Sequence, residues 1–339
     1  MKVGLIGNLG NGKKAFNGQT IKTREINNYL VKYFKVTSLD TSKYSKNIFR
    51  IFFAIKKLLK TNEVIIVMPA NRGYQIITPI IMFLNKRYHR KLIEIVIGGS
   101  RYQLFDKHCY LKKLAKKYQT IYVETNLMKK EYLKRGFNNV WVLPNVKALK
   151  IGKYHSTKDQ IKLCVCSRII KEKGIEEAIN AVIKANKALN KAVFSLDIYG
   201  DIKPSYEKKF NNILLNVPNY IKYQGKIAYQ KASLVLNKYD LMLFLTYYPN
   251  EGFAGSIIDA FYAGIPVITT KWNSNEEIIK DGVNGLLVSI KNVDEVASKL
   301  IMLYNNKELI DAMKKNCLQE VANYQIDKVL SILVDDIKK

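Results

Sequence analysis

Long apolar runs and cysteine patterns are missing from this sequence of 339 residues. No stretch reaches the roughly eighteen apolar residues that a membrane-spanning helix needs, so we expect no such helix. The short apolar run at the N-terminus ends in a glycine-rich loop, which predicts a first strand and no signal peptide. Cys164 and Cys166 would face the same side of one strand with no histidine nearby, so neither a disulfide nor a zinc site is expected. Reduced thiols of this kind indicate a cytoplasmic protein.

Acidic residues are scarce in the first part of the chain. Residues 1–150 carry 30 Lys and Arg against 7 Asp and Glu, a net charge of +23, whereas the rest carries 26 against 21, a net charge of +5. Such asymmetry favours an anionic partner for the first half, either a membrane leaflet or a nucleic acid, although a basic composition without function is an alternative. RNA-binding signatures and zinc-finger spacings are absent, so we expect an anionic membrane surface and no nucleic acid.

Three segments carry much of this basic charge, namely residues 43–60, 85–91 and 105–118. The first mixes Ile, Phe and Leu with Lys and Arg, which predicts an amphipathic helix able to lie on an anionic lipid surface. A helix that covers a sheet and exposes its lysines to water explains the same pattern equally well.

Short apolar runs alternate with helical segments twice along the chain, which predicts two parallel sheets covered by helices. The runs are 3–6, 36–39, 64–68, 92–97, 120–123 and 140–143, then 162–166, 194–199, 221–223, 241–245, 266–269 and 285–288. Pro144 and Asn145, with the polar stretch to Gln160, predict the linker between the two domains.

The stretch GNLGNGKKAFNGQT, residues 7–20, fits two phosphate-binding patterns. For a P-loop, Lys13 is in place, but Lys14 stands where a hydroxyl would hold magnesium. For a dinucleotide fingerprint, Gly10 and Gly12 fit, and Asp40 closes the next strand where a ribose-binding carboxylate would lie. Helical spacing begins only after residue 20, so we predict a loop of about ten residues, longer than usual and therefore functional.

The second half places two cations directly after a strand. In SRIIKEKGIEEAI the strand ends at Ser167 and Arg168, and a short loop then supplies Lys173 and Gly174 before a helix. Open α/β sheets bind ligands at this carboxyl edge. The arginine fork and the mobile lysine charge would suit a diphosphate.

A second motif, NEGFAGSIIDAFYAGIPVI, leads from a turn into a helix that begins near residues 254–256. The first-turn amides predict an anion site, because Gly252 and Gly255 have no side chains to block it. Asp259 lies one turn further on, where its carboxylate could accept hydrogen bonds from a sugar diol. Glu251 precedes the helix and would face whatever lies beyond the phosphates.

These two motifs, with YQGKI and EEIIKDGVNGLLV, resemble the retaining nucleotide-sugar glycosyltransferases of family 4, of the bacterial polysaccharide and glycolipid type. The resemblance covers most of the chain and is strongest from Lys162 to Val288. It implies an α/β protein with the GT-B fold, two Rossmann-like domains facing each other across a cleft. The acceptor-side domain would be 1–150, joined by a C-terminal helix at about 322–339, and the nucleotide-sugar-binding domain would be 151–321.

The resemblance also implies the roles of particular residues. Arg168 and Lys173 would neutralise the donor diphosphate, and Glu251 would touch the donor sugar, which makes these three the catalytic candidates. The implied donor-binding residues are Gly18, Gln19 and Thr20 over the phosphates, Gly225 and Ile227 against the nucleobase, Gly252, Phe253, Ala254, Gly255 and Ser256 around the phosphate, and Asp259 on the ribose. Residues 7–20 are then a phosphate-facing loop, and neither a P-loop nor a dinucleotide site.

Two departures from the family pattern stand out. The family has a second glutamate eight residues after the first, whereas this chain has Asp259, which is one methylene shorter. Many relatives carry a histidine after the strand that ends here in IVIGGSR, whereas this chain has glycine and serine at 98–100. None of His89, His108 and His155 is placed to replace that histidine.

The implied enzyme is a metal-independent hexosyltransferase without a cofactor, whose donor is a nucleotide-diphosphate sugar, with a UDP-sugar favoured. No Asp-x-Asp metal motif is present. The acceptor would be a saccharide or lipid-linked saccharide in cell-surface polysaccharide synthesis, at the inner face of the cytoplasmic membrane. Two alternatives remain: a sugar-nucleotide epimerase of the same fold, and a non-catalytic basic scaffold that binds membrane or nucleic acid.

Overall fold

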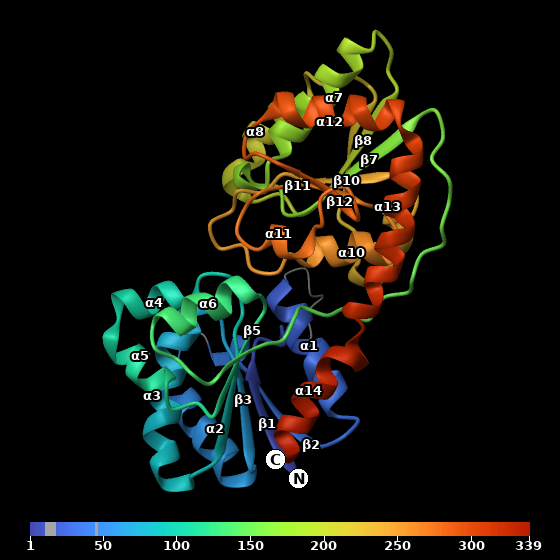
Figure 1. Cartoon of the computed structure of the whole chain (residues 1–339). Coiled ribbons are helices and arrows are strands. Elements are labelled where there is room, and N and C mark those ends of the chain that lie inside the picture. Colours follow the sequence, from blue (N-terminus) through green and yellow to red (C-terminus); the bar gives the residue numbers. More distant parts are fainter. Residues whose placement is uncertain (11–17, 45–46) are drawn as a thin grey trace. The chain divides into compact units, whose positions relative to one another are not determined.

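This computed structural model describes residues 1–10, 18–44 and 47–339 (Figure 1). The chain divides into two compact units, the first made of Met1–Ala148, Pro249–Phe253 and Tyr324–Lys339, and the second of Leu149–Tyr248 and Ala254–Asn323. The short segment Pro249–Phe253, called the Glu251 segment below, packs with the first unit although its neighbours in the chain belong to the second. The sequence-based boundaries would have left this segment in the second domain.

Six parallel strands form the first sheet in the order β2-β1-β3-β4-β5-β6. Their bounds are β1 Lys2–Gly7, β2 Lys35–Asp40, β3 Val64–Met68, β4 Lys91–Ile95, β5 Thr120–Val123 and β6 Val140–Val142. Strands covered on both faces are continuous apolar runs, and β3 and β5 are buried at every position. For this reason the apolar runs in the sequence located these strands to within two residues at each end.

Helices cover both faces of the first sheet. One face is covered by α2 (Ile48–Thr61), α3 (Asn71–Tyr88), α4 (Arg101–Lys107), α5 (Cys109–Ala115) and α6 (Asn126–Lys134). The other face is covered by α1 (Gly18–Leu30) and the C-terminal helix α14 (Ile326–Lys338), which lie side by side (Figure 1). The apolar stripe of α14 is thus buried against the first sheet, close to the N-terminal strand.

The second sheet is also all-parallel, in the order β12-β11-β10-β7-β8-β9. Its strands are β7 Ile161–Cys166, β8 Phe194–Tyr199, β9 Ile221–Gly225, β10 Leu241–Phe244, β11 Val267–Thr270 and β12 Gly285–Val288. One face is covered by α7 (Ile175–Ala188), α8 (Pro204–Leu214) and α12 (Val293–Asn305), and the other by α9 (Ala232–Leu236) and α10 (Gly255–Ala263) (Figure 1). Helix α13 (Lys307–Glu320) packs against α10 and α12, and the short α11 (Asn275–Ile278) follows β11. Because the strands are parallel, their carboxyl ends share one edge, where ligands bind in such folds.

Two helices begin at other residues than the sequence predicted. Helix α1 begins at Gly18 and not after Thr20, so the residues at 18–20 form its first turn. Helix α2 begins at Ile48, well inside the basic segment 43–60, because the side chain of Asn47 caps it by accepting a hydrogen bond from the backbone N–H of Arg50 at 3.0 Å. The residues before this cap, at 41–44, form a short 3₁₀ turn.

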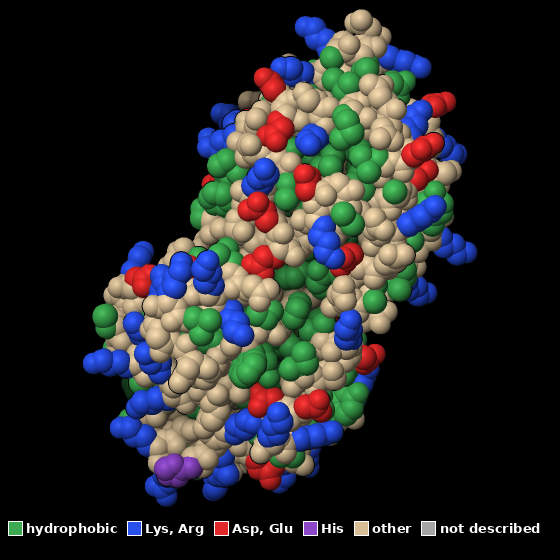
Figure 2. Space-filling view, viewed as in Figure 1, with side chains coloured by type: hydrophobic (Ala, Val, Ile, Leu, Met, Phe, Trp, Pro, Cys, Tyr) green, Lys and Arg blue, Asp and Glu red, His purple; other side chains and the backbone are tan. Residues whose placement is uncertain are grey.

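None of the described helices combines the length and hydropathy needed to cross a bilayer. No disulfide joins the four cysteines, all of which lie in the described part of the chain. Lys and Arg side chains are spread over the visible face of the first unit (Figure 2). Part of the basic charge that the sequence places in residues 1–150 thus lies on the surface of this unit.

Candidate functional site

The loop after β7 packs tightly on the end of β10. The backbone N–H of Tyr247 donates to the carbonyl of Glu172 at 2.8 Å, and the hydroxyl of Thr246 donates to the same carbonyl at 3.3 Å. Gly174 has φ +69°, and a Cβ there would overlap the carbonyl of Leu245. Glycine is therefore required where this loop turns into α7, and the turn fixes the residues before it against the carboxyl edge.

Both predicted cations of this loop lie over aromatic rings. The Arg168 guanidinium is exposed and lies 5.2 Å from the ring centre of Tyr248. The Lys173 ammonium is buried, 4.9 Å from the ring centre of Phe244 and 5.5 Å from that of Tyr248. Cation–π attraction to these rings helps to hold both positive charges in place. The shared Tyr248 ring brings the two cations to one place, and the Trp272 indole N–H holds its backbone by donating to the Tyr248 carbonyl at 2.9 Å.

The N-terminus of α10 lies at the same edge of the second sheet, because this helix follows β10. Its N-cap residue is Ala254, whose side chain has no oxygen to accept the first-turn N–H groups. The next residues, Gly255 and Ser256, are half-buried, so their amides and the helix dipole make a ready anion site. Asp259 is buried one turn further along, and the helix ends at Gly264 with φ +70°, as predicted from the sequence.

Gly225 and Ile227 lie at the carboxyl end of β9, the outer strand of this sheet. Gly225 has φ +78° and open space where a side chain would be, and Ile227 is half-buried. The second unit thus brings five predicted groups to one sheet edge: Arg168, Lys173, the start of α10, Asp259 and the end of β9.

The remaining predicted residues belong to the first unit. Glu251, Gly252 and Phe253 form most of the Glu251 segment, whose contacts are described below. Gly18, Gln19 and Thr20 form the first turn of α1, where the Thr23 hydroxyl donates to the Gln19 carbonyl at 2.9 Å.

The sequence also singled out residues in the loop before α1. Gly12, Lys13 and Lys14 lie outside the described residues. Asp40 accepts hydrogen bonds from the backbone N–H groups of Leu9 and Ser42, both at 3.0 Å. Its carboxylate thus holds the loops that follow β1 and β2.

Comparison with known proteins identifies the family of this chain. The model of the group 1 glycosyl transferases matches residues 146–319, just over half of the chain. The chain belongs to this family. An uncharacterised glycosyltransferase of Methanocaldococcus jannaschii is 26% identical over 172 residues, which are 50% of this chain and 43% of that protein. Alpha-monoglucosyldiacylglycerol synthase of Acholeplasma laidlawii is 24% identical over 184 residues, 54% of this chain and 44% of that protein. The chain therefore matches less than half the length of these curated relatives.

A solved structure of Anabaena HepE, in complex with UDP and glucose, resembles the whole chain with a TM-score of 0.72. The likeness covers 100% of this chain and 99% of HepE at 13% sequence identity, so it shows the fold alone. The predicted fold class, two Rossmann-like α/β units of the GT-B type, is confirmed. Family 4, retention, metal independence and the individual site residues stay predictions.

Sequence reasoning missed a buried ion pair at the carboxyl edge of the first sheet in this group 1 glycosyl transferase. Glu94 of β4 and Arg101 of α4 are fully buried and 3.0 Å apart, and the Tyr74 ring lies 3.9 Å from the guanidinium. Arg101 also donates to the carbonyl of Pro69 at 2.6 Å and to the side chain of Asn71 at 2.7 Å. Burial raises the pKa of Glu94 to about 7, against the opposing effects of Arg101 and the Tyr74 hydroxyl. A glutamate inside the apolar run KLIEIVI was the available signal.

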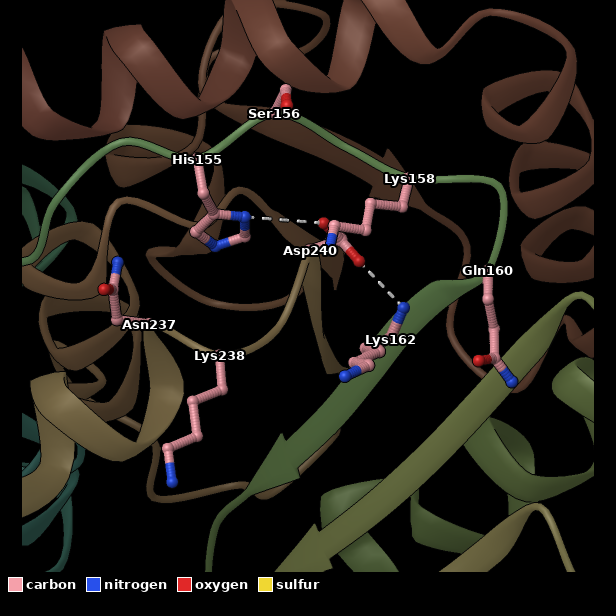
Figure 3. A pocket seen from close by; sticks show the side chains of 8 residues that line it. All are labelled: His155, Ser156, Lys158, Gln160, Lys162, Asn237, Lys238 and Asp240. Atoms are coloured by element: carbon pink, nitrogen blue, oxygen red, sulfur yellow. Dashed lines mark hydrogen bonds and ion pairs between the residues drawn. The ribbon is translucent and has the colours of Figure 1, made fainter.

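A cavity of about 380 Å³ lies at the opposite, amino edge of the second sheet (Figure 3). Its lining includes Lys158, Lys162, His155 and Asp240, and Asp240 is paired with the fully buried Lys314 at 2.7 Å. Lys162 is the second residue of β7 and Asp240 precedes β10, whereas Arg168 follows β7. The cavity is therefore separate from the predicted donor residues. No group of three or more His, Cys, Asp or Glu in the described part could hold a metal ion.

Proposed function

We propose that this chain is a retaining, metal-independent glycosyltransferase. It would move a hexose from a nucleotide-diphosphate donor, with UDP favoured, to a saccharide or lipid-linked saccharide acceptor in cell-surface polysaccharide synthesis. The single observation that carries the proposal is the carboxyl edge of the second sheet, where Arg168 and Lys173 share the Tyr248 ring beside the uncapped N-terminus of α10. Support also comes from the family and from HepE, whose structure contains UDP and glucose.

In the proposed reaction, the bond between the anomeric carbon and the β-phosphate oxygen breaks, and its electrons leave with the nucleoside diphosphate. Arg168, Lys173 and the amides of α10 stabilise the negative charge that grows on this phosphate, as oxyanion-hole donors do. The acceptor hydroxyl attacks the same face of the sugar and gives its proton to the departing phosphate oxygen, so the configuration is retained. Glu251 contacts the donor sugar, and Asp259 accepts hydrogen bonds from the ribose hydroxyls.

The first experiment is a thermal-shift screen with UDP, GDP, ADP and CMP and their sugar conjugates, since a bound ligand raises the melting temperature by mass action. The stabilising donor is then incubated with acceptors, and the product is followed by NMR. A new glycosidic bond with the donor's anomeric configuration, formed equally with EDTA present, is expected. An epimerised sugar nucleotide without acceptor would indicate an epimerase, and a protein stabilised by no nucleotide would contradict the proposal.

We further propose that the first unit docks on an anionic membrane through α2. The buried face of α2, which includes Ile51, Ile55, Leu58 and Leu59, covers the sheet, as one reading of the sequence expected. The opposite side exposes Ile48 by 54%, Phe49 by 74% and Phe53 by 63%. Exposed basic residues of the same helix surround these side chains: Arg50, Lys56, Lys57 and Lys60. Exposed aromatic groups within basic charge fit a lipid surface, and the lipid synthase of Acholeplasma laidlawii is among the similar proteins.

Liposome co-sedimentation tests this docking face. Binding is expected to need anionic lipid, to weaken with salt and to fall at least tenfold in the variant F49A/F53A. The matched control is L215A, which removes an apolar side chain that is 82% exposed on the second unit and should leave binding unchanged. Binding that ignores lipid charge, or that F49A/F53A retains in full, would contradict the proposal.

A further inference from the structure

The Glu251 segment is held on both sides of Glu251 by residues at the carboxyl edge of the first sheet. On one side, the backbone N–H of Gly99 donates to the carbonyl of Asn250 at 3.3 Å. On the other side, the backbone N–H of Phe253 donates to Oε2 of Glu124 at 3.1 Å. The Asn145 side chain also donates to the Phe253 carbonyl at 3.3 Å. The backbone of residues 250–253 is therefore fixed whatever the Glu251 side chain does.

Two glycines allow this close approach. A Cβ on Gly99 would overlap the carbonyl oxygen of Glu251. A Cβ on Gly252 would lie 2.5 Å from Oε2 of Glu124, which is far too close for a real contact. Gly99 stands in the turn that follows β4, and Glu124 directly follows β5, so two neighbouring strand ends make the contact surface.

The second carboxylate oxygen of Glu124 is occupied by Lys22. The Lys22 Nζ lies 2.6 Å from Oε1, and the two residues are only 3% and 6% exposed. Burying such a pair costs desolvation energy that an apolar pair would not, so it does not serve stability alone. Its useful effect is geometric, because Lys22 fixes the carboxylate in the plane that aims Oε2 at the Phe253 N–H, and a charged acceptor makes that hydrogen bond stronger.

We infer that Glu124, held by Lys22, is a positioning residue for sugar transfer, because it fixes the segment that carries Glu251. This inference rests on the proposed function for the role of Glu251 at the donor sugar. Lys22 lies on α1, one turn after the first-turn residues Gly18, Gln19 and Thr20. The same ion pair therefore connects the predicted phosphate-facing turn with the segment of the predicted sugar-contacting glutamate.

The test compares E124A with the wild type in two independent ways. Hydrogen exchange of a peptide that contains the Phe253 amide reports whether the Glu251 segment stays in place, independently of enzyme activity. The kinetics of sugar transfer and the affinity for UDP report the effect of its displacement on function. We expect E124A to exchange this amide at least tenfold faster and to lower kcat by 10- to 100-fold, with a smaller loss of UDP affinity, because Arg168 and Lys173, the cations predicted to bind the diphosphate, are not altered.

Two further variants of the ion pair distinguish a positioning role of Glu124 from a general loss of stability. K22M leaves Glu124 buried without its partner and should resemble E124A. In K22M/E124Q, the glutamine oxygen can still accept the Phe253 N–H with no buried charge left over, so kcat should return to within about fivefold of the wild type. If E124A does not fold, the comparison of K22M with K22M/E124Q uses the same readouts. K91M is the matched control, since it removes the ion pair of Lys91 with Asp336, 2.9 Å apart in the same unit, and should leave kcat and Phe253 exchange unchanged.

Each failure has its own signature. Unchanged exchange at Phe253 in E124A, or fast exchange with unchanged kcat, would overturn the inference. Absent rescue in K22M/E124Q would overturn the geometric reason given for the pair. A wild-type protein that binds no nucleotide sugar would refute the proposed function, while the exchange experiment would still report whether Glu124 holds the segment.

Discussion

The carboxyl edges of the two sheets use charge in opposite ways. In the first unit, Arg101 and Lys22 are buried and paired with Glu94 and Glu124, and both pairs also bind backbone atoms. In the second unit, Arg168 is exposed, forms no ion pair within the described residues and lies over an aromatic ring. Charge at the first edge holds the chain in place, whereas Arg168 at the second edge is, in our proposal, kept for a ligand.

This contrast shows why net charge alone misleads about the site. The first 150 residues carry a net charge of +23, yet two of the cations at their sheet edge are neutralised by carboxylates. The excess lies on the surface instead, for example around the exposed aromatic residues of α2. The nearly balanced second half supplies the cations that the proposed chemistry needs.

The largest expected effect comes from breaking the buried ion pair of Arg101 and Glu94 at the carboxyl edge of the first sheet. R101M leaves Glu94 buried without its partner and removes hydrogen bonds to Pro69 and Asn71, so the free energy of unfolding should fall by about 3 to 5 kcal/mol. Urea denaturation at pH 8 measures this loss. The control is R135M, which breaks surface pairs with Asp106 and Glu131 and should cost about 1 kcal/mol or less. Equal losses in the two variants would show that burial does not distinguish these pairs.

Removing Arg168 from the carboxyl edge of the second sheet should lower activity and leave stability intact. R168A removes an exposed cation, so the melting temperature should stay constant while kcat/KM falls by about 30- to 1,000-fold, which corresponds to about 2 to 4 kcal/mol of transition-state stabilisation. K173A should lose a similar amount of activity. K171A is the control, because Lys171 is exposed in the same loop and has no assigned role. Wild-type turnover in R168A would remove the basis of the proposed mechanism.

The first edge should also be sensitive to pH, through Glu94. Its pKa is raised from 4.5 to about 7, so the folded state binds the proton more tightly than the unfolded state. The resulting stabilisation is fully present below about pH 4.5 and is lost as pH rises towards 7, by up to about 3 kcal/mol. Urea denaturation of the wild type and E94Q between pH 5 and 8 should show the wild type losing stability relative to the variant. A constant difference would mean that Glu94 keeps an ordinary pKa.

Local patterns in the sequence were sufficient for the sheets and for the second edge. β3 and β5 were predicted without error, because both are buried at every position, as expected of strands covered on both faces. The start and end of α10 followed from glycines at fixed positions, and the loop with Arg168 and Lys173 followed from a strand that ends in a cation. Each of these features depends on residues within about ten positions of one another.

Features built from distant residues were not predictable in this way. Lys22 and Glu124 are 102 positions apart, and nothing local in either segment indicates that they meet. The Glu251 segment was assigned to the second domain because its neighbours in the chain are there, whereas its packing is decided by Gly99 and Glu124. The sequence predicted a helix over residues 43–60. The helix α2 begins only at Ile48, because the side chain of Asn47 caps it there.

The smallest expected effect concerns Asp259 at the carboxyl edge of the second sheet. Family 4, which the sequence resembles, has a longer glutamate at this position. D259N should weaken UDP binding about tenfold, since one hydrogen bond to a charged group contributes about 1.5 kcal/mol. Calorimetry with UDP and with 2′,3′-dideoxy-UDP tests the cause, because the penalty should vanish when the ribose hydroxyls are absent. D259E should not improve affinity, since Asp259 is buried in a helix surrounded by packed side chains, and the extra methylene should cost about 1 to 3 kcal/mol of stability. Equal UDP affinity in D259N and the wild type would assign the ribose to another residue and leave the aspartate a structural part of α10.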